Sequence, residues 1–189
     1  MKQIFSLIVL MMVALRVSAA EQFVIFQPSG DALSLQDVGI SYDVREQPCV
    51  HRAIASLQGD FQKVTGRVPN GSAQRIVIGT VGVNSQIDQW VKKGVLQNLK
   101  GKNEKYIIKT IGDQLVIAGS DKRGTVFGIY ELSKQIGVSP WYYWADVPVE
   151  QHDTFYIIRG EYTDGEPAVK YRGIFLNDEA PCLSSWVKN

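Results

Sequence analysis

The sequence contains few metal-binding side chains. Its 189 residues include two cysteines, Cys49 and Cys182, and two histidines, His51 and His152. Their spacing matches no known zinc site, and we expect no metal and no cofactor. Two cysteines do not make a disulfide framework. Because Cys49 opens a predicted helix and Cys182 lies beside a predicted strand end, we interpret them as separate buried thiols.

The chain also lacks an excess of charge of either sign. It has 20 basic and 19 acidic residues, a formal net charge of +1. Without Lys2 and Arg16, which lie in the first twenty residues, 18 basic residues face 19 acidic ones, a net charge of −1. Such a balance does not favour binding of a polyanion, so we expect no nucleic-acid partner.

The N-terminus has the order of a secretory signal peptide. Lys2 gives a positive start, residues 4–15 form an uncharged and mostly apolar run, and Val17-Ser18-Ala19 supplies small residues for cleavage. The run is too short for a permanent membrane anchor, so we expect no membrane insertion. A buried N-terminal helix is the alternative, but no amphipathic stripe supports it. Residues 1–20 therefore predict a periplasmic or secreted protein.

The remaining chain has the length of one domain, in which helices alternate with strands. Pro48 opens a helix whose apolar residues recur at steps of four and three until Gly66 closes it. The predicted strands are 23–26, 40–44, 75–80, 105–111, 114–118 and 154–159, and the other predicted helices are 85–93 and 121–136. This order predicts an α/β fold, a mixed β-sheet with helices packed against it, over residues 21–160. Gly112-Asp113 predicts a hairpin turn.

Two segments outside this pattern allow more than one interpretation. The loop Gly119–Gly124 precedes a helix, where backbone N–H groups can hold an anion, but a tight turn with Ser120 or Asp121 as N-cap explains it better. The aromatic run 141–144 is either a sugar-stacking platform or a surface packed between two domains, and we favour packing. We interpret the polar segment 160–167 as a linker.

A last apolar strand is predicted over residues 169–176, followed by Asn177, Asp178 and Glu179. Polar residues at the carboxyl end of a strand are where α/β folds place binding sites. Adjacent residues on an extended strand point in opposite directions, so the carboxylates of Asp178 and Glu179 do not act on one atom. The alternative is a solvated loop, or an ion pair with Arg172 or Lys170.

Four segments together resemble the opening of glycoside hydrolase family 115, the xylan α-1,2-glucuronidases. They are IAGSDKRGTVFGIYELS (117–133), IGVSPW (136–141), WADVP (144–148) and VKYRGIFLNDE (169–179), and the resemblance runs from about residue 23 to the end. The first part also resembles the non-catalytic α/β domain that precedes the barrel in β-hexosaminidases. In family 115 a (β/α)8 barrel follows the α/β domain. Residues 161–189 of this chain would then be a linker and the first strand of a barrel that is otherwise absent.

The resemblance implies substrate-binding roles for Asn177, Asp178 and Glu179 at the active-site mouth, and for Arg172 farther down the same strand. It implies no catalytic residue in this chain, because the acid and base are expected beyond residue 189. The complete enzyme would remove (4-O-methyl)glucuronic acid from glucuronoxylan by an inverting mechanism. The alternatives are a stand-alone carbohydrate-binding module, or a module that packs against a catalytic barrel or another subunit.

Overall fold

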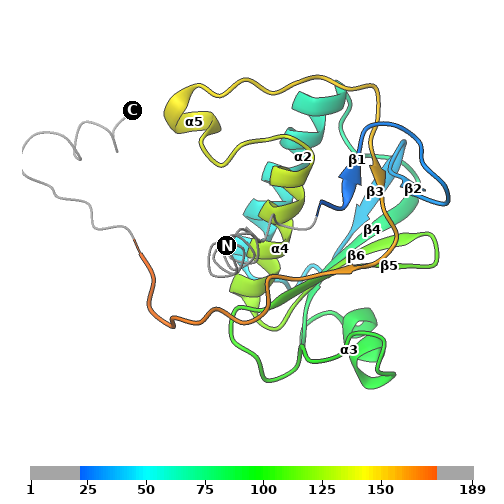
Figure 1. The fold of residues 1–189 in the computed structure, drawn as a ribbon. Coiled ribbons are helices and arrows are strands. Elements are labelled where there is room, and N and C mark those ends of the chain that lie inside the picture. Colours follow the sequence, from blue (N-terminus) through cyan, green and yellow to red (C-terminus); the bar gives the residue numbers. More distant parts are fainter. Residues whose placement is uncertain (1–21, 174–189) are drawn as a thin grey trace, which may run out of the picture.

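The computed structural model describes residues 22–173, and residues 1–21 and 174–189 lie outside the described part. The main sheet has five strands in the order β3-β4-β6-β5-β8 (Figure 1). Its strands are β3 (Val38–Ser41), β4 (Ala73–Thr80), β5 (Tyr106–Ile111), β6 (Gln114–Gly119) and β8 (Glu161–Tyr162). The first three strands in spatial order are parallel, and β5 and β8 run antiparallel to their neighbours. The sheet is therefore mixed, as the sequence predicts.

Helices cover both faces of this sheet. The helices are α2 (Pro48–Thr65), α3 (Ser85–Lys92), α4 (Lys122–Gln135) and the short α5 (Tyr142–Ala145). Figure 1 shows α2 and α4 side by side on one face and α3 on the other. A second, small sheet joins β1 (Val24–Ile25), β7 (Tyr156–Ile157) and β2 (Leu33–Ser34).

The two sheet faces form two separate cores because side chains alternate along each strand. Ile76 and Ile78 of β4 lie in the core beneath α2 and α4, whereas Val77 between them lies in the smaller core beneath α3. Both strands β4 and β6 are buried on both sides, which explains why each appears in the sequence as a continuous apolar run.

Close packing of α4 on the sheet depends on two glycines. A Cβ atom on Gly124 would lie 2.2 Å from the Lys105 carbonyl oxygen, and one on Gly128 would lie 2.8 Å from Cγ2 of Ile117. Real side chains do not approach so closely, so only glycine lets this helix pack at its observed depth.

The predicted helices and the central strands are confirmed, including α2 from Pro48 and its end at Gly66, whose φ is +70°. Gly112, with φ +57°, occupies the first turn position of the β5–β6 hairpin, as in a type II′ turn. Three other strands are shorter than predicted. They cover Val24–Ile25 instead of 23–26, Val38–Ser41 instead of 40–44, and Tyr156–Ile157 instead of 154–159.

The segment after residue 160 differs from the prediction. The sequence predicts a linker over residues 160–167, but Glu161 and Tyr162 form β8, which pairs with Lys109 and Ile108 of β5. Residues 169–173, the first part of the predicted last strand, have no regular secondary structure, and residues 174–176 lie outside the described part. The division into a domain ending at 160 and a following barrel strand stays a prediction.

Candidate functional site

The carboxyl ends of the parallel strands β3, β4 and β6 meet at one edge of the sheet. In α/β folds this edge is the usual ligand site, because the loops leaving neighbouring strands diverge there and leave a crevice. Here the loop after β3 leads to α2, the loop after β4 leads to α3, and the loop after β6 leads to α4. α2 and α3 cover opposite faces, so a crevice is expected beside the end of β4.

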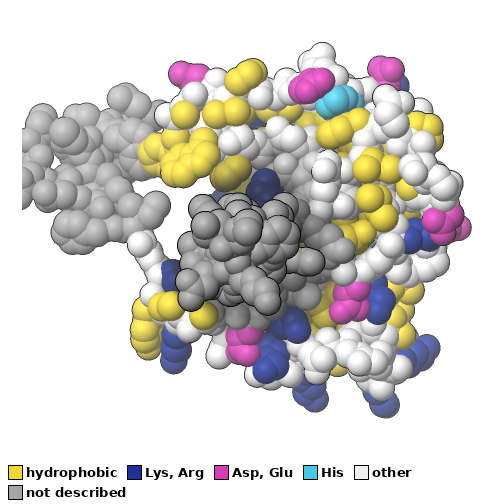
Figure 2. Space-filling view, viewed as in Figure 1, with side chains coloured by type: hydrophobic (Ala, Val, Ile, Leu, Met, Phe, Trp, Pro, Cys, Tyr) yellow, Lys and Arg dark blue, Asp and Glu magenta, His cyan; other side chains and the backbone are white. Residues whose placement is uncertain are grey.

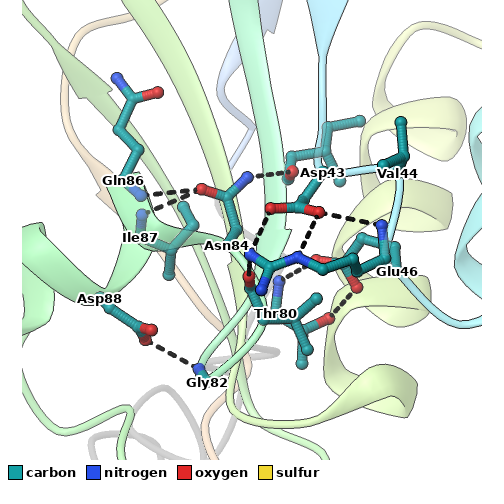
Figure 3. A network of polar contacts seen from close by, with 12 residues as sticks. Asp43, Val44, Glu46, Thr80, Gly82, Asn84, Gln86, Ile87 and Asp88 are labelled. Carbon is teal, nitrogen blue, oxygen red and sulfur yellow. Dashed lines mark hydrogen bonds and ion pairs between the residues drawn. The ribbon is translucent and has the colours of Figure 1, made fainter.

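Side chains of the protein itself fill this crevice (Figure 3). Glu46, only 4% exposed, accepts a hydrogen bond from the Thr80 backbone N–H at 2.7 Å and another from the Thr80 hydroxyl at 2.7 Å. The Thr80 hydroxyl also lies 2.7 Å from the hydroxyl of Thr125, in the first turn of α4. Because hydrogen bonds engage both carboxylate oxygens, Glu46 joins the loop before α2 to β4 and α4.

The rim of the crevice is also bonded within the chain. Asn84 caps α3 by accepting hydrogen bonds from the backbone N–H groups of Gln86 and Ile87 (Figure 3). Asp43 accepts two hydrogen bonds from the Arg45 guanidinium, at 2.9 and 2.7 Å, and one from the Arg45 backbone N–H. The guanidinium and this N–H lower the pKa of Asp43 to about 2. The carboxylates at this edge thus serve the fold.

Arg172, the predicted substrate-binding residue within the described part, lies beside the N-terminal end of α4. Its guanidinium forms an ion pair with Glu104 and donates a hydrogen bond to the Val169 carbonyl at 2.6 Å. Arg123 binds the other oxygen of Glu104 at 2.8 Å. Both guanidinium groups lie over the ring of Phe127, 5.7 and 5.8 Å from its centroid, at cation–π distance.

Residues 163–172, which we call the strap, lead from β8 to Arg172 and are fixed to the sheet domain. The Tyr106 hydroxyl donates a 2.5 Å hydrogen bond to Asp164. Burial, and then the Asp164 carboxylate, raise the pKa of Tyr106 well above its ordinary value. Glu166 accepts a hydrogen bond from the Asn103 backbone N–H at 2.8 Å and pairs with Lys102 at 3.2 Å, and both lower its pKa.

The aromatic run lies in the long connection between α4 and β7, and of its four residues Tyr142 packs against the main core. Trp141 directly precedes α5 and Trp144 is the third residue of that helix, and each is 63% exposed. Figure 2 shows the yellow hydrophobic surface over α5 at the upper left of this face. Lys63 of α2 lies 4.9 Å from the ring centroid of Tyr142 and helps to hold α5 against the domain. This surface suits either of the two interpretations of the run.

The structure tests the prediction of a buried thiol at one of the two cysteines. Cys49 is exposed, so the expectation of a buried thiol is wrong there, because it lies on the solvent side of the first turn of α2. Cys182 lies outside the described residues. His51 is half-buried against Tyr42, and His152 stacks on Phe26 with ring centroids 3.7 Å apart. Across residues 22–173 no three His, Cys, Asp or Glu side chains gather as a metal site would require.

Asn177, Asp178 and Glu179 lie outside the described residues, so their predicted roles stay predictions. The sequence prediction missed Glu46 and Glu104, each of which organises a cluster of polar contacts. No motif marks either residue, since their partners are up to 68 residues away along the chain. No helix within residues 22–173 has the length and apolar character to cross a membrane.

Comparison with known proteins addresses the family. The model of glycosyl hydrolase family 115 matches residues 164–189. Among solved structures, the chain is similar to BtGH115A, a family GH115 4-O-methyl-α-glucuronidase with specificity for decorated arabinogalactans. The two share 34% sequence identity with a TM-score of 0.70, over 87% of this chain and 21% of that one. The chain belongs to glycosyl hydrolase family 115.

More distant structures are also similar to this family 115 chain. A chitobiase of Flavobacterium johnsoniae shares 13% identity with a TM-score of 0.49, over 82% of this chain and 21% of that one. A β-N-acetylhexosaminidase of Streptomyces coelicolor A3(2) shares 12% identity with a TM-score of 0.47, over 77% of this chain and 26% of that one. No curated protein matches the chain. The family 115 chain thus spans about a fifth of the length of the solved relative with which it shares 34% identity.

Proposed function

We propose that this chain is the non-catalytic α/β domain of an exported family 115 α-glucuronidase. The supporting observation is the 34% identity to a 4-O-methyl-α-glucuronidase over nearly the whole chain, which covers only 21% of that enzyme. The internal bonding of Glu46 and Asp43 at the carboxyl edge of the sheet agrees with a role other than catalysis. In this proposal the domain supports a catalytic barrel against which it packs.

The complete enzyme in this proposal removes (4-O-methyl)glucuronic acid from glucuronoxylan with inversion. One carboxylic acid protonates the leaving oxygen, and a carboxylate about 6.5–9.5 Å away activates a water on the opposite face of the sugar. Both groups are supplied by residues beyond 189. In this proposal Asn177, Asp178 and Glu179 contact the substrate at the barrel mouth, and Arg172 contacts it from farther down the same strand. To contact the substrate, the Arg172 guanidinium must either leave Glu104 or bind Glu104 and the substrate at the same time.

The test begins with the coding DNA after the codon for Asn189. We expect it to continue in frame into a barrel, and a stop codon with no barrel-encoding sequence nearby would refute the proposal. The 189-residue chain and the extended product are then incubated with glucuronoxylan, with debranched xylan as the control. We expect glucuronic acid release from the extended product alone. Release by the 189-residue chain would contradict its non-catalytic role.

The polysaccharide that carries the uronic acid is tested in the same assay. The similar enzyme BtGH115A has specificity for decorated arabinogalactans, and this favours arabinogalactan as the alternative to xylan. Release from the two polymers is compared at equal uronate content, and NMR of the first-formed sugar reports its anomeric configuration. Faster release from glucuronoxylan supports xylan as the substrate. Release from arabinogalactan alone would overturn it.

The exposed rings of Trp141 and Trp144 favour a second candidate, a module that binds carbohydrate or packs against another domain. Calorimetry of the chain with glucuronoxylan fragments tests the carbohydrate function. Binding that is lost in Trp141→Ala and Trp144→Ala variants of unchanged fold would support it. Absence of heat in the unmodified chain would exclude it and leave packing as the role of this surface.

A further inference from the structure

Two adjoining pockets form a groove between α4 and the strap. The strap is orange in Figure 1 and crosses the N-terminal end of α4. The pockets have volumes of about 270 and about 460 Å³. Glu104, Pro167 and Arg172 line both pockets and mark their junction. Together the pockets offer room for more than one sugar ring, and their linings differ in chemistry.

The smaller pocket is cationic. Four basic and three acidic side chains line it, and each acid is already engaged within the protein. Glu104 is shared by two arginines, and Glu166 is bound by Lys102 and a backbone N–H. Lys122 and Lys170 also line the smaller pocket. Neither lysine forms an ion pair with another residue of the described range 22–173, and Lys170 approaches only the Tyr171 ring, at 5.3 Å. The pocket therefore has unneutralised positive charge.

The third acid, Asp121, explains why the cationic character comes from side chains rather than from the end of α4. Its carboxylate accepts hydrogen bonds from the backbone N–H groups of Arg123 and Gly124 at 2.9 and 2.8 Å, and from that of Glu104 at 2.8 Å. These first N–H groups of the helix are thus occupied. An incoming anion would meet the lysine ammonium groups instead.

The larger pocket combines aromatic rings with charged side chains. Its acids are engaged within the protein, because Glu131 pairs with Lys134, Asp164 accepts the hydrogen bond of the Tyr106 hydroxyl, and Glu104 is held by its two arginines. Phe127, Tyr130 and Pro140 line this pocket, and Tyr130 is 46% exposed. Flat rings of this kind pack against the apolar faces of sugar rings, while a tyrosine keeps its hydroxyl in water. Phe127 lies beneath the guanidinium groups of Arg123 and Arg172, which fixes the boundary between the aromatic and the cationic pocket.

We propose that this groove binds an acidic oligosaccharide, with a sugar carboxylate at Lys122 and Lys170 and a neighbouring sugar ring on Tyr130. The choice of glucuronate as the acidic sugar rests on the proposed function, whereas the cationic and aromatic linings do not. The groove would hold the polymer on the α/β domain, beside the segment that the proposed function assigns to the first barrel strand. Neither Trp141 nor Trp144 lines the groove, although Pro140 of the larger pocket directly precedes Trp141.

Binding to the 189-residue chain is measured by calorimetry with two probes of equal length at low ionic strength. One is a xylo-oligosaccharide bearing 4-O-methylglucuronate, and the other is the neutral xylo-oligosaccharide. We expect the acidic probe to bind at least about threefold more tightly, because two exposed lysines each contribute a modest amount. Raising the ionic strength to 0.15 M shortens the screening length to about 8 Å and should reduce the difference.

The double variant Lys122→Gln/Lys170→Gln removes the unneutralised charge. We expect its affinity for the acidic probe to fall about threefold to tenfold, with neutral binding unchanged. Lys92→Gln/Lys93→Gln is the matched control, since both lysines are exposed at the end of α3 on the opposite sheet face. Tyr130→Ala should weaken both probes, whereas Tyr130→Phe should retain binding.

Equal affinity for acidic and neutral probes would overturn the proposal, and so would an equal loss in the groove pair and the control pair. These outcomes differ from failure of the proposed function. An extended product that releases glucuronic acid, together with a chain that binds no acidic probe, would overturn the groove alone. A chain that binds the acidic probe selectively supports the groove even where the extended product releases nothing.

Discussion

The Glu46–Thr80–Thr125 network gives the sharpest prediction about stability. Glu46→Ala would leave the buried Thr80 backbone N–H without an acceptor and would remove a second, charge-assisted hydrogen bond from the Thr80 hydroxyl. An unsatisfied buried donor costs about 1–3 kcal/mol. The hydroxyl can turn toward Thr125, so its loss adds less. We expect Glu46→Ala to lower the free energy of unfolding by about 2–4 kcal/mol.

Glu46→Gln separates the hydrogen bonds from the charge. The amide oxygen can still accept from the Thr80 N–H, and the amide NH2 can donate to the Thr80 hydroxyl oxygen, which then donates to Thr125. A neutral group also avoids the cost of burying a carboxylate for which residues 22–173 supply no cationic partner. We therefore expect the free energy of unfolding of Glu46→Gln to lie within about 1 kcal/mol of that of the unmodified chain.

Urea unfolding at pH 7, followed by circular dichroism and tryptophan fluorescence, measures these differences. For a domain of this size the Ala variant should lower the midpoint by about 1–2 M with an unchanged slope. Glu150→Ala is the matched control, because its side chain is 85% exposed and has only a 4.0 Å contact with His152. An Ala variant as stable as this control, or a Gln variant as unstable as Ala, would refute the reasoning.

Two further predictions concern the helices and the rim of the crevice. Gly124→Ala should destabilise the domain by at least about 3 kcal/mol or prevent folding, because its Cβ would overlap the Lys105 carbonyl. The control Gly59→Ala in α2 meets no atom within 4 Å and should stabilise the domain by about 0.5–1 kcal/mol. Equal effects of the two substitutions in thermal unfolding would contradict this. Asp43 should titrate in NMR with a pKa of about 2, and Arg45→Gln should return it toward about 3.9. Because folding lowers the pKa of Asp43, the stabilisation from its ion pair with Arg45 is present above about pH 4 and disappears as the pH falls through about 2. An unchanged Asp43 titration in Arg45→Gln would contradict the ion pair.

The sequence determined much of the fold, because its signals are local. The apolar steps of α2, its Pro48 start and the positive φ at Gly66 all concern residues within one or two turns of each other. The same holds for the Gly112 turn, where the register of a two-residue hairpin follows from its length. Periodicity also separated helices from central strands, since a doubly buried strand leaves a continuous apolar run.

The short outer strands were less predictable. β8 has two residues in a segment rich in turn residues, and it forms only because β5 offers an unpaired edge. The same edge explains why residues 160–167 are not a free linker. Composition describes what a segment can do alone, whereas pairing depends on a neighbour about fifty residues earlier in the chain.

The sequence by itself determined the mixed α/β architecture, the caps and the resemblance to family 115. Only the tertiary structure decided the surroundings of the polar residues. It placed Glu46 against Thr80 and Arg172 against Glu104, contacts that span 34 and 68 residues. It also left Lys122 and Lys170 together beside an aromatic pocket. The physical reason is that helix and strand periodicity follow from neighbouring residues, while the charge and hydrogen bonding of a groove depend on which distant segments the fold brings together.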